Sequence, residues 1–189
     1  MAARLFLALC ALTSGLSVSV ARAQPCEATR IPWAAGAGLH VGDFLATPTD
    51  PDHTAEANTG IATSSRAGAD PATFVVEAEA FFDPCKSWFR RGATDSATLA
   101  HEQLHFDITE VFARRLLARY EREITDHRDF LRRHERLYDE VWRASRRRQE
   151  AYDTEVYADR ARQAWWAAWT RTQLEATRAY AEGRIRLPM

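Results

Sequence analysis

The sequence predicts an α+β fold in which a small N-terminal antiparallel sheet packs against about three long C-terminal helices. Six of the seven prolines fall between Pro25 and Pro84, whereas residues 93–182 contain neither glycine nor proline. These two residue types are the least compatible with a helix interior, so a strand-and-loop half is followed by a helical half. The length suits one domain. We expect it to span residues 24–189, with its strand-and-loop part over 24–92.

The first 23 residues have the composition of an export signal that is removed from the mature protein. Arg4 supplies a positive start, residues 5–20 are almost wholly apolar, and the small residues Ala21 and Ala23 suit cleavage before Gln24. An uncleaved anchor is the alternative, but the run is short for a spanning helix and no later stretch is longer. We therefore expect a periplasmic or secreted protein without stable membrane insertion.

The charge balance argues against a nucleic-acid partner. Removing residues 1–23 deletes two of the 25 basic residues and none of the 26 acidic ones, so the mature chain has a net charge of −3 with histidine neutral. The run Arg146-Arg147-Arg148 stands among acidic residues. Such a run is typical of a solvated helix face.

Two cysteines, Cys26 and Cys85, remain after the signal is removed. Two cysteines alone could hold a metal ion only with further ligands from histidine or carboxylate side chains. Because the chain is bound for an oxidising compartment, we expect a disulfide between them. This bond would tie the mature N-terminus to the end of the strand region.

Alternation of apolar and polar residues predicts the strands. From Thr73 to Phe82 apolar side chains occupy every second position, and two glutamates lie on the opposite face. Shorter strands are expected at Leu39–Leu45 and Gly60–Ser64. They are separated by a loop rich in proline, aspartate and threonine, from Thr47 to His53.

The helical part is expected to divide into three helices. The first starts just after Gly92, where Thr, Asp and Ser side chains offer N-caps, and it ends near Glu123. The second is expected over Asp126–Ala144 and the third over about Gln149–Tyr180. Side chains at helical spacing are expected to face the core. In the first helix these are Ile108, Phe112 and Leu116, and His101 and His105 continue the same stripe. In the second helix they are Phe130, Leu137, Val141 and Trp142, and in the third they are Trp165, Trp166 and Trp169.

The first helix carries the sequence His101-Glu102-Gln103-Leu104-His105, which matches the HExxH pattern of zinc peptidases. Residues four apart lie one helical turn apart, so both imidazoles can reach one zinc ion at about 2.0–2.1 Å. Glu102 would accept a proton from a zinc-bound water that attacks a carbonyl group and would pass it to the leaving amine. The alternative is that the two histidines hydrogen-bond carboxylates in the core, where an unliganded pair would cost desolvation energy.

A catalytic zinc usually takes three protein ligands and keeps one position for water. The pattern HExxHxxGxxH does not supply the third, because Ile108 and Val111 stand where glycine and histidine are needed. A carboxylate from the third helix is the economical candidate, although acids on such a helix also pair with surface arginines. The candidates are Asp153 and Glu155, followed by Glu150 and Asp159. Asp107 is expected instead to hydrogen-bond a ligand histidine or to cap a neighbouring loop.

The segment from His101 to Ile108, HEQLHFDI, resembles a bacterial family, the domain-of-unknown-function family 922 (DUF922), described as predicted secreted zinc-dependent proteases. The likeness covers most of the mature chain, from Trp33 to Trp166. The resemblance implies a metal site at the two histidines and a catalytic role for Glu102. The family continues its Tyr-Asp-x-Glu stretch with Thr and then His, whereas this chain departs from that pattern at Val156-Tyr157-Ala158.

These observations predict a bacterial zinc-dependent hydrolase, secreted or periplasmic, that acts as a peptidase on a peptide or protein substrate. The departure at Tyr157 motivates one alternative, a non-catalytic envelope binding or assembly protein that retains the fold. A second alternative is a zinc amidase acting on cell-wall material. Tyr152 or Tyr157 could stabilise an oxyanion, although a tyrosine on such a helix more often packs between helices.

Overall fold

The computed structural model of this chain describes residues 26–90 and 96–189. The expected signal segment and the residues expected to cap the first helix at 94–95 lie outside this range. The strands are β1 (Ile31–Pro32), β2 (Ala55–Glu56), β3 (Thr59–Ala67), β4 (Thr73–Phe82), β5 (Trp88–Phe89) and β6 (Arg184–Pro188), and the helices are α1 (Ser96–Glu123), α2 (His127–Ala158) and α3 (Arg162–Ala176). Antiparallel strands and three helices confirm the α+β class.

The long strand β4 is the centre of the main sheet. It pairs antiparallel with β3 from Thr59↔Phe82 to Ala67↔Phe74. Its other edge is shared by β1, which pairs at residues 81–82, and by the C-terminal strand β6, which pairs at residues 73–77. The expected alternation in β4 is confirmed, since every second side chain from Phe74 to Phe82 is buried. A separate two-stranded sheet is formed by β2 and β5.

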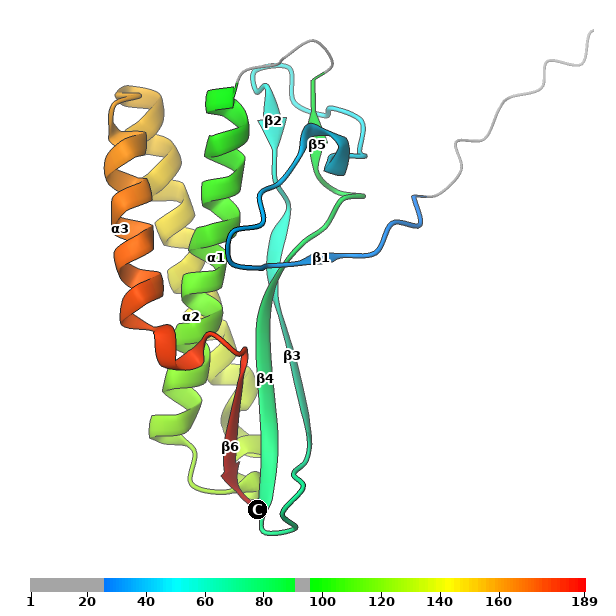
Figure 1. Cartoon of the computed structure of the whole chain (residues 1–189), viewed down its shortest axis with the longest axis vertical. Helices are drawn as coiled ribbons and strands as arrows, with labels where there is room; N and C mark the ends of the chain where they lie inside the picture. The colour runs from blue at the N-terminus through cyan, green and yellow to red at the C-terminus, as the bar shows by residue number, and fades with distance from the viewer. Residues whose placement is uncertain (1–25, 91–95) are drawn as a thin grey trace, which may run out of the picture.

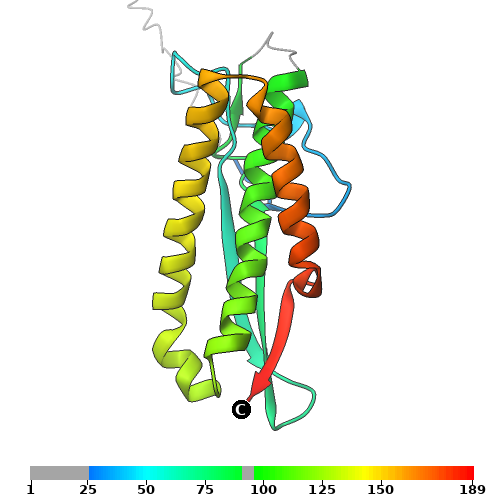
Figure 2. The same ribbon diagram turned by 90° about the vertical axis from the view of Figure 1, so that its left-hand side faces the viewer.

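Helix α1 lies between the sheet and the other two helices. One face of α1 packs on β3 and β4, and α2 and α3 flank α1 on the side away from the sheet (Figures 1 and 2). The apolar stripe of α1 is buried as expected from Ile108 to Leu116. Burial of this helix on both sides gives one continuous core, which joins the strand half to the helical half.

The division of the helical part differs from the expectation. Helix α2 continues to Ala158, and the break falls at residues 159–161, not near 145–148. The expected gap contains no glycine or proline, and Ser145 within it is buried, so nothing interrupts the helix there. Asp159 instead has an extended backbone, and its carboxylate accepts the amide N–H of Ala161 at 2.9 Å. Asp153 and Glu155 therefore belong to the second helix.

Two further expectations are corrected. Residues 39–45 form no strand but a loop with a short 3-10 turn at Val41–Asp43, because the Asp43 carboxylate accepts the amide N–H of His40 and closes a turn. Trp165 was expected in the core but is 46% exposed, and its ring instead lies under the guanidinium of Arg162. Its neighbour Trp166 is fully buried.

Cys26 and Cys85 form the expected disulfide. The bond joins the segment before β1 to the turn that follows β4, so it closes a loop of 59 residues along the chain. Within the described residues, no helix combines the length and the apolar character needed to span a bilayer.

Candidate metal centre

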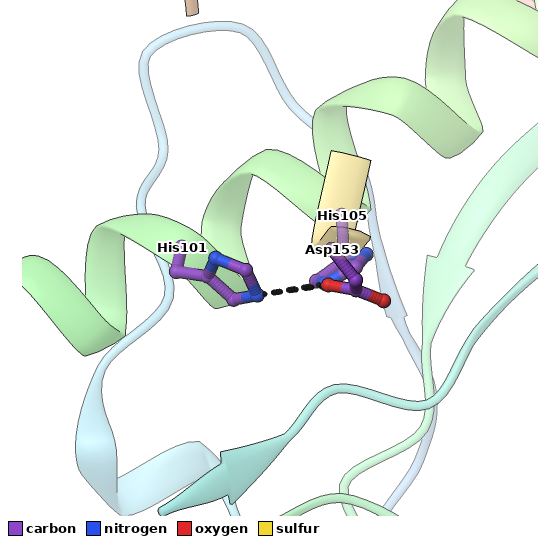
Figure 3. Close-up of side chains that lie close together, drawn as sticks. All are labelled: His101, His105 and Asp153. Carbon is purple, nitrogen blue, oxygen red and sulfur yellow. Dashed lines mark hydrogen bonds and ion pairs between the residues drawn. The ribbon is translucent and has the colours of Figure 1, made fainter. Parts of the chain in front are cut away.

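Three side chains converge where the N-terminal part of α1 meets the C-terminal part of α2 (Figure 3). His101 and His105 come from successive turns of α1, and Asp153 comes from α2. The two Nε2 atoms lie 3.1 Å apart, and Asp153 Oδ1 lies 3.1 Å from His101 Nε2 and 2.9 Å from His105 Nε2. Within residues 26–90 and 96–189, this is the one group of three or more histidine, cysteine or acidic side chains placed to share a metal ion.

A buried tyrosine fixes the distance between the two helices at this point. Tyr152 precedes Asp153 on α2 and is fully buried. Its ring stacks on the His101 ring at 4.6 Å and meets the His105 ring edge-on at 4.9 Å. Its hydroxyl donates to the carbonyl oxygen of His101 at 3.4 Å. The next residue, Asp153, is thereby held against both imidazoles.

Gln149, one turn before Asp153 on α2, fixes the protonation of His105. The Gln149 amide N–H₂ donates to the carbonyl oxygen of His105 at 3.0 Å and to the hydroxyl of Thr109 at 3.1 Å. Its Oε1 is therefore the atom that faces His105 Nδ1, at 2.6 Å, and it accepts the Nδ1 proton. In the neutral ring the lone pair is then on Nε2, the nitrogen that faces Asp153 and His101.

The three facing atoms are electron-rich, so they lie this close only with a proton or a metal ion among them. A lone pair on His105 Nε2 lies 2.9 Å from a carboxylate oxygen, and these two electron-rich atoms repel unless a proton or a metal ion lies between them. Burial favours the neutral ring of His105, but the Asp153 carboxylate outweighs burial and raises the pKa of His105. Burial is likewise outweighed at Asp153, whose pKa the two histidines hold well below its usual range.

Glu102 lies beside this centre and is held by the strand half. Its side chain is buried, and its Oε2 accepts the backbone N–H of Ala57 at 2.7 Å, just after β2. Burial raises the pKa of Glu102, and the charges of His105 and His101 oppose that shift only in part. A buried carboxylate with a raised pKa takes up a proton more readily than an exposed one, which suits a general acid–base role.

The centre opens into a cleft of about 540 Å³ between α1, α2 and the segment around β2. His101, His105, Glu102 and Asp153 all line this cleft, and Ala57 and Gln149 lie on its walls. The volume is in the range of small-molecule and peptide sites. The arrangement can therefore bind a metal ion with solvent access on one side.

The other carboxylates suggested as ligands lie elsewhere. Glu155 accepts hydrogen bonds from Arg162 Nη2 at 2.5 Å and from the indole N–H of Trp166 at 3.1 Å, so it joins α2 to α3. Asp159 ends α2. Glu150 lines the outer wall of the cleft and does not join the converging group. Of the four acids, the structure brings only Asp153 to both histidines.

Asp107 does not contact a histidine ring. Its Oδ1 accepts the indole N–H of Trp33 and the amide N–H of Gln103, each at 2.8 Å. Gln103 Oε1 in turn accepts the backbone N–H of Leu39 at 2.7 Å. Of the two roles expected for Asp107, the structure therefore favours the anchoring of a neighbouring loop, here the segment between β1 and the 3-10 turn.

Sequence reasoning missed Gln149 and His53 as parts of this site. Gln149, Asp153 and Tyr157 are spaced four residues apart on one helix, so they share a face, and that spacing is visible in the sequence. His53 carries no such signal, because it lies in the loop before β2 and reaches the cleft only through the fold.

Comparisons with protein-family models, with curated proteins and with solved structures find no match to this chain. The evidence for its function therefore lies in the geometry of the site. Three features define the site: the converging side chains of His101, His105 and Asp153, the buried Glu102, and the cleft that they line.

Proposed function

We propose that this chain is an exported zinc-dependent hydrolase of the DUF922 type, a peptidase in which Glu102 carries the proton of the attacking water. The observation that supports this function is the convergence of His101, His105 and Asp153 next to a buried glutamate in an open cleft. The disulfide between Cys26 and Cys85 supports export, since such bonds persist in oxidising compartments.

The donor set suits zinc. Two imidazole nitrogens and one carboxylate oxygen are typical of catalytic zinc sites, which keep a fourth position open. Ligands at 2.0–2.1 Å from a tetrahedral ion are about 3.3 Å apart. The three donor atoms are separated by 2.9–3.1 Å, so binding requires them to spread by only a few tenths of an ångström. Gln149 already holds His105 in the tautomer that a metal ligand needs.

The roles of the side chains follow from their positions. His101, His105 and Asp153 would hold the ion. Zinc, when bound, lowers the pKa of water toward about 7 and polarises a carbonyl group. Glu102 accepts a proton from the attacking water and delivers it to the leaving nitrogen, while the backbone N–H of Ala57 keeps its carboxylate in place.

A non-catalytic binding protein is the competing function. Its motivation is Tyr157, which stands where the family has a histidine. The position of Asp153 favours the enzyme, because this carboxylate supplies a third donor without any contribution from residue 157. A protein that bound metal for structure alone would have no need of a cleft of about 540 Å³ over the site.

Metal analysis and hydrolysis assays on the purified mature protein test this function. We expect about one zinc per chain, with the zinc lost in His101→Ala and His105→Ala. We expect Glu102→Gln to keep the zinc and to lose hydrolysis of a peptide library. His40→Ala is the matched control, since His40 is exposed and lies outside the cleft.

Three results would decide against the peptidase. Folded wild-type protein without metal would overturn the zinc site. Full hydrolysis by Glu102→Gln would overturn the role of the glutamate. Cleavage of cell-wall fragments with no cleavage of peptides would assign the same chemistry to an amidase.

A further inference from the structure

Two cavities meet at the metal centre. The cleft of about 540 Å³ lies on one side, and a second cavity of about 490 Å³ lies on the other, toward the start of α3. Both are lined by His53, Ala55, His101, Glu102 and Tyr157. A substrate long enough to occupy both cavities therefore has its middle at these shared residues.

Tyr157 is the free hydroxyl group at this junction. It lies one turn after Asp153 on α2, so it faces the same side of the helix. The residue is 64% exposed, and its ring centroid lies 5.9 Å from that of the His101 ring. Among the described residues, no hydrogen-bond partner of its hydroxyl is found. Tyr152 cannot take this role, because it is fully buried and its hydroxyl already donates to the carbonyl oxygen of His101.

The phenol is a hydrogen-bond donor over the working range of pH. A tyrosine hydroxyl has an ordinary pKa of about 10, so it keeps its proton at neutral pH.

A fixed loop holds the Tyr157 ring from the other side. His53 packs against that ring, with the ring centroids 5.7 Å apart. His53 Nδ1 donates to Asp50 Oδ2 at 2.8 Å. Arg90, just after β5, donates to the carbonyl oxygen of His53 at 2.7 Å and also to the carbonyl oxygen of Asp50. The Tyr157 ring thus lies between the imidazoles of His53 and His101, and Arg90 holds the loop that carries His53.

We infer that Tyr157 is a catalytic residue, which donates a hydrogen bond to the carbonyl oxygen of the bond being cleaved, and that His53 is the residue that positions it. This inference rests on the proposed function and deepens it: the scissile bond lies inside a peptide that spans both cavities.

The chemistry balances without any further reactant. The water oxygen bonds to the carbonyl carbon, and the C=O electron pair moves onto the carbonyl oxygen, where the Tyr157 O–H donates a hydrogen bond and keeps its proton. Glu102 takes one proton from the water and gives it to the leaving nitrogen as the C–N bond breaks. The products are a carboxylic acid and an amine. A donor aimed at such an oxygen contributes about 10²–10³-fold to kcat.

The test compares Tyr157→Phe with the zinc-loaded wild-type protein on the internally quenched peptide that the wild type cleaves fastest. We expect kcat to fall about 100-fold with KM little changed. The affinity for a phosphonamidate analogue of that peptide, measured by calorimetry, should fall by a similar factor, and zinc affinity should not change. Tyr180→Phe is the matched control, because the Tyr180 hydroxyl bonds to Glu121 away from both cavities.

Two substitutions at residue 53 separate positioning from direct contact. His53→Ala removes the ring that packs on Tyr157 and should lower kcat, whereas His53→Phe keeps a ring there and should restore most of the activity. Equal loss in both variants would mean that His53 itself contacts the substrate.

The outcomes distinguish this inference from the function on which it rests. Unchanged kcat and unchanged analogue affinity in Tyr157→Phe would overturn the role of Tyr157 and leave the zinc peptidase standing. No hydrolysis by the zinc-loaded wild type would overturn both. Cleavage confined to terminal residues would refute a substrate that spans the two cavities.

Discussion

Replacing Gln149 with leucine tests whether the protein prepares His105 for a metal. The substitution keeps the approximate volume of the side chain and removes three hydrogen bonds, to His105 Nδ1, to the carbonyl oxygen of His105 and to the hydroxyl of Thr109. It leaves both imidazoles and Asp153 in place. Any effect on zinc must therefore come from the orientation and tautomer of one ligand.

The magnitude follows from the shortest of these contacts. Gln149 Oε1 lies 2.6 Å from His105 Nδ1 and is the only partner of that nitrogen among the described residues. Loss of a partner that orients a metal-bound histidine typically lowers metal affinity about 10–100-fold. At about 1.4 kcal/mol per factor of ten, the binding free energy should weaken by about 1.4–2.8 kcal/mol.

Zinc affinity is measured by competition with a chromophoric chelator, after circular dichroism has shown that each variant is folded. Gln173→Leu is the matched control, since it removes a glutamine that bonds to Arg115, outside both cavities. We expect the control to bind zinc like the wild type. Wild-type affinity in Gln149→Leu would refute the reasoning that this amide selects the His105 tautomer.

Three further predictions concern stability. Glu110→Ala leaves its buried partner Arg114 without a counter-charge and should lower the free energy of unfolding, measured in urea, by about 3–5 kcal/mol. Glu175→Ala removes one partner of an exposed ion pair and should lower it by less than about 1 kcal/mol. Equal losses in the two variants would contradict this prediction. Hydrogen bonds from arginines lower the pKa of Glu123 below 4.5, so the stability that its carboxylate adds is present above that pH and is lost as the pH falls through the lowered pKa. The melting temperature of Glu123→Gln should therefore depend less steeply on pH in acid than that of the wild type. An identical slope would count against this prediction. Cys85→Ser opens a loop of 59 residues and should lower the free energy of unfolding by about 2–4 kcal/mol in the same urea assay. An unchanged free energy of unfolding would contradict this prediction.

The elements that were predicted best are those whose evidence is local. Strand β4 shows its alternation within ten residues, and α1 shows its apolar stripe within 28. Strand β6 was missed, because five residues at the end of the chain carry too little pattern and become a strand only by pairing with β4. The break between α2 and α3 was misplaced, because residues 93–182 contain no glycine or proline that would mark it, and the structure ends α2 at Ala158.

The candidate site, too, could be predicted only where its evidence lies within one helix. The spacing of His101 and His105 follows from helix geometry, so the sequence alone was enough to predict that one ion could meet both rings. Asp153 and Glu155 could not be ranked, since residues two apart on a helix point in widely different directions. Which of them faces α1 depends on the rotation of α2 about its own axis.

The sequence by itself determined the α+β class, the pairing of two cysteines and the placement of two imidazoles beside an acid on one helix. The tertiary structure decided which carboxylate completes the site, which amide holds His105 and which loop brings His53 over the cleft. The physical reason is that periodicity acts within one element, whereas the rotation and register of α2 are set by burying residues such as Leu137, Tyr152 and Val156. The contact between Tyr152 and His101, for example, joins residues 51 positions apart in the chain.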